Sequence, residues 1–101
     1  MRILDLVEVT VKYMLGLREI TGGKKEDKLR ISGSTLTDLL KELTKLYGNR
    51  IRYALFDREL IHISPSIIIM INGREARHLK DLETNLVDGD EIVIVPPAGG
   101  G

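Results

Sequence analysis

The chain has 101 residues, and its fifteen basic and fifteen acidic side chains give a formal net charge of zero. This balance argues against nucleic acid as a partner, because nucleic-acid binding rests mostly on excess positive charge. The absence of cysteine excludes disulfides, thiolate catalysis and zinc–thiolate sites. No apolar run reaches the ~20 residues of a membrane span, and acidic residues interrupt positions 1–8 too early for a signal-peptide core. We therefore expect a single cytoplasmic domain with neither a nucleic-acid nor a membrane partner.

The first regular pattern is an alternation from Val7 to Tyr13, in which the odd positions are apolar and the even positions polar. Period two over this length predicts a strand with one buried face. A shorter alternation, Lys28 to Ile31, predicts a second strand that pairs back on the first. The glycine-rich connection between them is too long for a tight hairpin turn, so we expect its tip to be mobile.

The segment after Gly33 carries the clearest helix signal. Thr35 is a favourable N-cap, and Asp38 three residues later adds a capping-box-like start with an acid in the first turn. Gly48 occupies the usual position after the last turn. Apolar residues recur between these ends at three- and four-residue spacing and predict one stripe packed on a sheet: Leu36, Leu39, Leu40, Leu43, Leu46 and Tyr47. The apolar pattern of 51–55 allows a further short helical turn, and an irregular connection follows over 58–65.

The segment Ser66–Ile71 is apolar at five successive positions, which predicts a strand that is central in the sheet with neither face in water. Asn72-Gly73 then predicts a turn. A second turn, Asp88-Gly89-Asp90, leads into a final strand, Glu91–Val95. The residues between these turns, 75–87, have little periodicity.

The expected order is strand, strand, helix, strand, strand. One main helix across one face of a mixed sheet is an α+β architecture, and this order fits a β-grasp, or ubiquitin-like, fold. We expect the β-grasp domain to span residues 1–95 and a separate tail to span 96–101. Because the helix covers only one face of the sheet, the other face must meet loops or a partner.

The register of the third strand decides which side chains reach a partner. The helix side takes either Ile67, Ile69 and Ile71 or Ile68 and Met70, and the sequence does not decide between these sets. We expect the remaining set, drawn from Ile67, Ile68, Ile69 and Met70, to form a partly exposed patch beside the C-terminal strand. Partners would dock on this patch.

No constellation of side chains predicts catalysis by this chain alone. The two histidines stand in loop-like segments without metal-ligand spacing, and the paired acids stand in turns, where carboxylates usually act as caps. Two serines flank a proline without a histidine partner at a recognisable spacing, and the basic pairs indicate solvated faces. The residues considered are His62, His78, Asp57 with Glu59, Asp88 with Asp90, Ser64, Ser66, Lys24 with Lys25, and Arg50 with Arg52.

The chain ends in two prolines, an alanine and three glycines: Pro96, Pro97, Ala98, Gly99, Gly100 and Gly101. Prolines keep the base of this tail extended and away from the sheet. Glycines lack a Cβ, so the tail can thread a narrow channel in another protein. Its reach of roughly 20 Å would carry the terminal carboxylate into a partner's active site. We expect the tail to be exposed and poorly ordered in the isolated protein; the alternative is a frayed terminus without a role.

Taken together, these features resemble the ubiquitin-like sulfur carriers of the MoaD and ThiS type, and most closely the small subunit of molybdopterin synthase, MoaD. The resemblance extends from about Val9 to the end of the chain. Met14 and Leu15 stand where members often have an aromatic residue and an alanine, and the stretch 51–65 is longer than in compact members. The matching motifs are Val11-Lys12-Tyr13, Leu17-Arg18-Glu19-Ile20-Thr21-Gly22, Thr35-Leu36-Thr37-Asp38-Leu39-Leu40, Ile71-Asn72-Gly73-Arg74-Glu75, Leu86-Val87-Asp88-Gly89-Asp90-Glu91 and the tail.

This resemblance implies that the chain is a co-substrate and a non-catalytic subunit, with no cofactor or metal of its own. An ATP-dependent activating enzyme would adenylate the carboxylate of Gly101, and sulfur from a sulfurtransferase would convert it to a thiocarboxylate. A MoaE-like large subunit would then receive the tail, which ends in Gly100 and Gly101. There the sulfur would build the dithiolene of molybdopterin, in the synthesis of the molybdenum or tungsten cofactor.

Two other interpretations stay open from the sequence. The same diglycine tail fits sulfur carriage for tRNA thiolation, or attachment to protein lysines as a ubiquitin-like modifier. A β-grasp interaction module with an inert tail belongs to a third class. The final acceptor depends on partner surfaces that this sequence does not contain.

Overall fold

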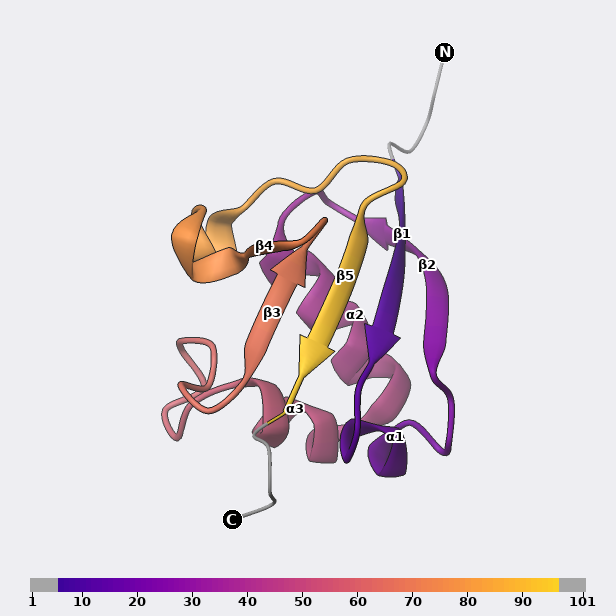
Figure 1. Cartoon of the computed structure of the whole chain (residues 1–101), viewed down its shortest axis with the longest axis vertical. Helices are drawn as coiled ribbons and strands as arrows, with labels where there is room; N and C mark the ends of the chain where they lie inside the picture. The colour runs from indigo at the N-terminus through magenta and orange to yellow at the C-terminus, as the bar shows by residue number, and fades with distance from the viewer. Residues whose placement is uncertain (1–5, 97–101) are drawn as a thin grey trace.

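Residues 6–96 are the part of the chain that the computed structural model describes, and they form a mixed five-stranded sheet with helices on one face (Figure 1). The elements are β1 (Leu6–Tyr13), α1 (Leu17–Ile20), β2 (Glu26–Ser32), α2 (Leu36–Tyr47), α3 (Asn49–Leu55), β3 (Ile68–Ile71), β4 (Arg74–Glu75), the 3-10 helices η1 (Ala76–His78) and η2 (Asp81–Glu83), and β5 (Glu91–Val95). The strands lie in the order β2-β1-β5-β3-β4. β1 and β5 run parallel, and the other neighbouring pairs are antiparallel. This is the predicted α+β, β-grasp architecture.

β1 and β2 form the predicted antiparallel pair. Val9, Val11 and Tyr13 are buried at the odd positions of β1, as the alternation predicts. Pairing with β1 continues beyond the predicted segment 28–31, so β2 is longer at both ends.

The connection between β1 and β2 contains a helical turn that the sequence did not predict. α1 buries Leu17 in the core. The Arg18 Nε donates to the Tyr13 carbonyl at 2.9 Å, and the Thr21 hydroxyl donates to the Lys24 carbonyl at 2.8 Å. These local bonds give the connection a defined shape.

α2 begins and ends where its local signals predict. The Thr35 hydroxyl accepts from the Asp38 amide at 3.3 Å, and the Asp38 carboxylate accepts from the Thr35 amide at 3.0 Å, which completes a capping box. Gly48 ends the helix with a positive φ of 79°. The prediction for Leu46 is wrong, because this side chain is 51% exposed. At 3.6 residues per turn Leu46 lies at the edge of the apolar stripe rather than in its centre.

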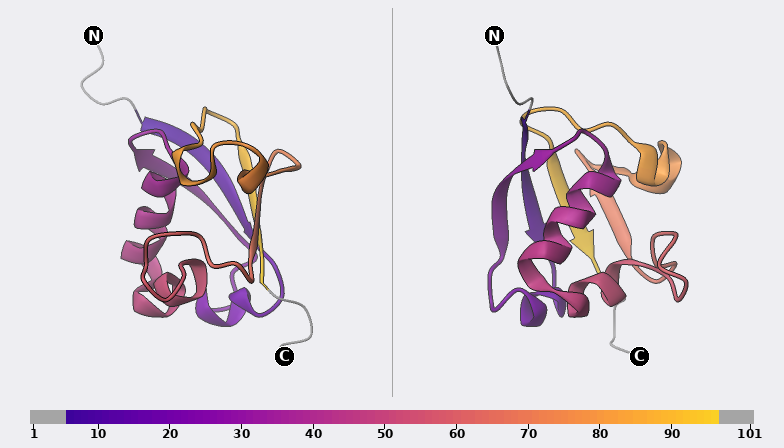
Figure 2. Two further views of the ribbon diagram at one scale, coloured as in Figure 1. Left: turned by 90° about the vertical axis from the view of Figure 1, so that its left-hand side faces the viewer. Right: turned by 180° about the vertical axis from the view of Figure 1, so that it is seen from behind.

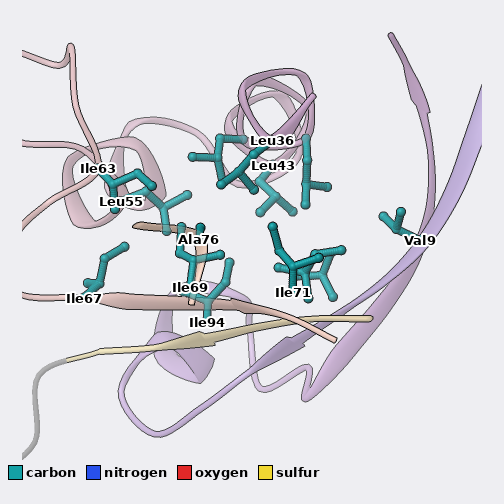
Figure 3. Packing of buried hydrophobic residues seen from close by; sticks show 14 of the residues in the cluster. Val9, Leu36, Leu43, Leu55, Ile63, Ile67, Ile69, Ile71, Ala76 and Ile94 are labelled. Atoms are coloured by element: carbon teal, nitrogen blue, oxygen red, sulfur yellow. The ribbon is translucent and has the colours of Figure 1, made fainter. Parts of the chain in front are cut away.

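The core lies between α2 and the side of the sheet that faces it (Figure 3). Leu36 and Leu43 of α2 point toward Ile69, Ile71 and Ile94 of the strands, and all five are buried. Each such side chain contributes roughly 1.5–3 kcal/mol when it is removed from water. This packing fixes the orientation of the helix across the sheet (Figure 2).

The prediction that β3 has neither face in water is wrong. Ile69 and Ile71 are buried, but Ile68 is 43% exposed. The middle strand of the sheet is β5, and β3 is bordered on its other side by β4, which pairs only with Met70 and Ile71. No helix described here covers the outer face of β3, since α2 and α3 lie behind the sheet in Figure 1. The apolar run of β3 therefore combines a core face with a face that is open to solvent.

The predicted helical turn after α2 is confirmed as α3, and the loop after it has a defined turn. Phe56 pairs with Ile63 in an isolated bridge. The Asp57 carboxylate accepts from the amides of Ile61 at 3.0 Å and His62 at 3.3 Å. The hydrogen bond from the Ile61 amide is the main cause that lowers the pKa of Asp57.

The segment without periodicity, 75–87, contains η1 and η2 and packs at the end of β3 and α2. None of the helices within residues 6–96 combines the length and apolar character needed to cross a bilayer.

A shared carboxylate ties the end of α2 to the first two strands. Asp27 of β2 accepts hydrogen bonds from the hydroxyls of Tyr13, at 2.8 Å, and Tyr47, and from Lys24 Nζ at 3.1 Å. The two tyrosine rings meet edge to face with centroids 6.0 Å apart. Burial would raise the pKa of Asp27, but the bonds from Tyr47, Tyr13 and Lys24 outweigh it and lower this pKa. Burial, with the bond to Asp27, raises the pKa of Tyr47 to about 12.

Candidate functional site

β5 leads into the tail from the middle of the sheet (Figure 1). On one side Val95 pairs with Ile68 of β3, and on the other the Met14 amide donates to the Ile94 carbonyl at 3.1 Å. Pro96 is half-buried at this end of the strand. The tail residues 97–101, with their predicted exposure and lack of order, lie outside the described residues. The start of the tail is thus held from both sides.

Four apolar side chains lie together on the face of the sheet opposite α2, and we call them the outer patch: Ile68, Met70, Val93 and Val95. The strand register pairs Ile68 with Val95 and Met70 with Val93. Alternation places all four on one face, because Ile69 of the same strand faces the core. Ile68 is exposed and the other three are half-buried. The outer patch therefore ends at the point where the tail begins.

An ion pair borders the outer patch on the β1 side. Lys12 Nζ lies 2.9 Å from Glu91 Oε2, and both side chains reach solvent. The hydrogen bond and the charge of Glu91 raise the pKa of Lys12. An apolar centre with a polar border is the usual composition of a protein–protein interface.

Side-chain amide and carboxylate groups hold the other end of β5. Asn72 Nδ2 donates to Asp90 Oδ1 at 2.8 Å, and the Glu91 amide donates to Asn72 Oδ1 at 2.9 Å. Asp90 Oδ2 also accepts from the Val87 amide at 2.9 Å. The predicted turns at 72–73 and 88–90 are thus bound to each other, and they set where β5 starts.

The structure separates the residues that the sequence proposed for partner binding. Ile67 and Ile69 are buried on the helix side of β3, whereas Ile68 and Met70 belong to the outer patch. Val93 and Val95 also belong to the outer patch, although the sequence alone does not single them out. The alternation within 91–95 is the signal that would have found them, once β5 is paired with β3.

The other candidate side chains form no catalytic arrangement in the part of the chain described. His62 and His78 are exposed, and His62 Nδ1 lies 3.3 Å from the Asp57 carboxylate. The hydroxyls of Ser64 and Ser66 bond to each other at 2.9 Å. No group of three or more His, Cys, Asp or Glu side chains within residues 6–96 could hold a metal ion. What the described domain offers is a partly exposed apolar patch beside the root of a tail.

The chain is similar to known proteins over most of its length. The chain matches the ThiS family over residues 11–101. Small archaeal modifier protein 3 of Haloferax volcanii is 30% identical over 95 residues, which cover 94% of this chain and 100% of that protein. The molybdopterin synthase sulfur carrier subunit of Aedes aegypti is 30% identical over 101 residues, which cover 96% of this chain and 92% of that protein.

A solved structure shares the fold over almost its whole length. The solution structure of small archaeal modifier protein 1 from Methanosarcina acetivorans has a TM-score of 0.78 and 41% sequence identity, with 96% of this chain and 99% of that chain covered. The crystal structure of the Amycolatopsis orientalis BexX/CysO complex contains a chain that is 29% identical to this one, with a TM-score of 0.73. The chain therefore belongs to the ThiS family of ubiquitin-like sulfur carriers, which includes carriers of the MoaD type.

Proposed function

We propose that this chain is the sulfur-carrying small subunit of a molybdopterin synthase, and that its reactive group is the carboxylate of Gly101. The observation that carries the proposal is the position of the outer patch at the root of the tail. A partner that covers Ile68 and Val95 also holds the end of β5, because these residues pair across the strands. From that fixed end the tail of 96–101 reaches roughly 20 Å.

The chemistry needs two enzyme partners and a sulfur donor. An activating enzyme joins the Gly101 carboxylate to the AMP part of ATP and releases pyrophosphate, which makes the acyl carbon open to attack by sulfur. The persulfide of a sulfurtransferase attacks this carbon and displaces AMP. A second thiol of the enzyme partners then cleaves the acyl disulfide, so that a thiocarboxylate remains on Gly101 and the two enzyme thiols are left as a disulfide. A MoaE-like large subunit then takes the tail into its active site and transfers the sulfur to the molybdopterin precursor. We place these steps in the cytoplasm, where ATP is available.

The residues of the chain divide into three roles in this scheme. Gly100 and Gly101 present the reactive carboxylate, and Pro96, Pro97, Ala98 and Gly99 supply reach. Ile68 and Met70, with Val93 and Val95, contact the partners. Ile67 and Ile69 have no part in binding, since they are buried in the core. The domain itself contributes position rather than acid–base chemistry.

Reconstitution tests the proposal. The full chain is incubated with the activating enzyme, ATP and a sulfur source, and then with a MoaE-like large subunit and the molybdopterin precursor. The expected result is an intact mass that shows one oxygen replaced by sulfur, and molybdopterin that forms only with the loaded chain. A loaded chain that yields no molybdopterin would show that the acceptor lies elsewhere.

A second candidate is supported by the relatives named small archaeal modifier proteins, at 30% and 41% identity. In that function the activated Gly101 carboxylate forms an amide bond with a lysine of another protein. Digestion of proteins from the source cells distinguishes the two candidates by mass spectrometry. Branched peptides that carry the Gly100-Gly101 ending on lysine support the modifier, and a free thiocarboxylate on this chain supports the carrier.

A further inference from the structure

A groove lies on the helix side of the molecule, away from the outer patch. α2, the end of α3, the loop after α3 and η2 enclose a volume of about 420 Å³. Its walls are formed by Thr37, Lys41, Thr44, Lys45, Arg52, Phe56, Leu60, Ile61 and Leu82. Figure 2 shows α2 and this loop together on one side of the sheet, and Figure 1 shows the outer face on the other.

The groove has three cations and no acid among its described lining residues. Lys41, Lys45 and Arg52 are exposed, and none of them forms an ion pair with any residue of 6–96. Lys41 and Lys45 stand four apart on α2, a spacing at which like charges repel. The whole chain is neutral, so this local excess of positive charge is balanced elsewhere on the molecule.

Apolar side chains share the lining of the groove with these cations, and local bonds hold the loop that carries Leu60 and Ile61. The Asp57 carboxylate accepts from the Ile61 amide at 3.0 Å, and the Leu60 amide donates to the Asp57 carbonyl at 2.9 Å. Leu60 has a φ of 60°, a left-handed conformation that is unfavourable for leucine. Ile61 is nevertheless 59% exposed, so the turn presents an isoleucine to solvent without burying it in the core.

We propose that this groove binds an acidic peptide segment of a protein partner, with one apolar side chain set against Leu60, Ile61 and Leu82. Acidic side chains of the segment would pair with Lys41, Lys45 and Arg52. The volume suits a few side chains rather than a folded domain. The wall is mainly aliphatic, with Phe56 half-buried, and it lacks the exposed aromatic platform on which single-stranded RNA usually stacks.

The position of the groove makes this contact separable from the sulfur chemistry. The tail starts at the end of β5, and the alternation of the strands places the outer patch on the face away from α2. Figure 2 shows α2 on the other side of the sheet. A partner segment in the groove would leave the tail and the outer patch free. It could hold this chain beside an enzyme while the tail is loaded or emptied, and binding does not require Gly101.

Amide chemical shifts of the ¹⁵N-labelled full chain test the proposal. The probes are twelve-residue synthetic peptides of Asp and Glu with a single central Leu, Ile or Phe, the same peptides with Asn and Gln in place of the acids, and a single-stranded RNA of mixed sequence. The acidic peptides should shift the amides of Lys41, Lys45 and Ile61, and do so less as salt is raised. The neutral peptides should leave them unchanged.

Charge and wall variants complete the test. Lys45→Gln with Arg52→Gln should weaken the acidic peptide about five-fold, the loss expected from two exposed ion pairs. Ile61→Ser should weaken it without loss of folding, since the side chain is exposed. The matched control is Lys25→Gln with Lys28→Gln, two exposed cations outside the groove, and it should bind as the unchanged chain does. The proposal would be overturned if no acidic peptide shifted these amides, or if only the RNA did. It would also be overturned if Lys45→Gln with Arg52→Gln bound the acidic peptide as tightly as the unchanged chain.

Discussion

Ile68 and Ile69 are neighbours in β3 but lie on opposite faces of the sheet, the first 43% exposed and the second 1% exposed. Ile69 packs under α2 with Leu36 and Leu43 (Figure 3). Ile68 pairs with Val95 at the end of β5 and belongs to the outer patch. One position along the chain thus separates a residue that packs in the core from one that lies in the solvent-exposed outer patch.

The same substitution at these two positions should therefore have different effects. Ile68→Asp should change the free energy of unfolding by less than about 1 kcal/mol, because the side chain already contacts water. It should weaken binding to the activating enzyme and to the large subunit, since a charge would be buried in an apolar interface. Urea denaturation and binding titrations of the same preparation measure the two effects.

Ile69→Ala provides the matched core substitution. Removing a buried isoleucine side chain should lower the free energy of unfolding by about 2–5 kcal/mol. Binding by the fraction that remains folded should be unchanged. If Ile68→Asp unfolded the domain as much as Ile69→Ala does, both faces would be core and partners would have to dock elsewhere.

Gly33→Ala should destabilise the start of α2. Gly33 has a φ of 97°, and a Cβ at this position would collide with the Asp38 carboxyl group. The substitution would displace the Asp38 side chain from the amides of Ser34 and Thr35, each 3.0 Å away. We expect the free energy of unfolding to fall by about 2 kcal/mol, because the backbone is strained and the cap is lost.

Gly22→Ala is the control for that variant. Gly22 also has a positive φ, of 72°, but nothing lies within 4 Å of the added Cβ. The free energy of unfolding of this variant should fall only by the cost of the backbone strain, about 1 kcal/mol. Thermal or chemical denaturation of both variants gives the comparison, and equal losses would show that the Asp38 cap contributes little.

Asp27→Asn should reduce the stability of the fold near neutral pH by about 1–3 kcal/mol, because a carboxylate that accepts three hydrogen bonds is lost. The pKa of Asp27 is lower in the folded chain than its ordinary value. The folded chain therefore gains stability from the ionised form above about pH 4, and loses it as the pH falls through the folded pKa.

The acid limb of the stability profile measures this effect. The unchanged chain should lose more stability than Asp27→Asn between about pH 4 and pH 2. Tyr47→Phe removes one hydrogen-bond donor but keeps the Asp27 carboxylate. Its loss of stability over this pH range should therefore lie between those of the unchanged chain and Asp27→Asn. Parallel profiles for all three proteins would contradict the assigned role of Asp27.

The elements that the sequence predicts well are those with local causes. Thr35 and Gly48 bound α2 through capping, and the alternation of β1 needs no knowledge of its partner strand. Ile68 could not be placed in the same way. A run of isoleucines is equally compatible with a strand buried on both faces, and only the short β4 and the position of α2 show that one face stays open.

Features that depend on long-range contacts were also missed. Nothing near Asp27 in the sequence indicates that Tyr13 and Tyr47 converge on it from two other elements. Arg52 was interpreted as a solvated cation, and its place in a groove with Lys45 follows only from the packing of α3 beside α2. The outer patch is predicted in part from one face of β3, but Val93 and Val95 join it only through the register of β5 with β3.

Deletion of Gly101 tests the central claim most directly. The full chain and the shortened chain are each incubated with the activating enzyme, ATP and a sulfur source, and their intact masses and denaturation midpoints are measured. The full chain should show one oxygen replaced by sulfur. The shortened chain should show no such change at the same midpoint, because its carboxylate is withdrawn by about 3.3 Å from the position where it reacts. A shortened chain that accumulates the thiocarboxylate as fast as the full chain would contradict the account.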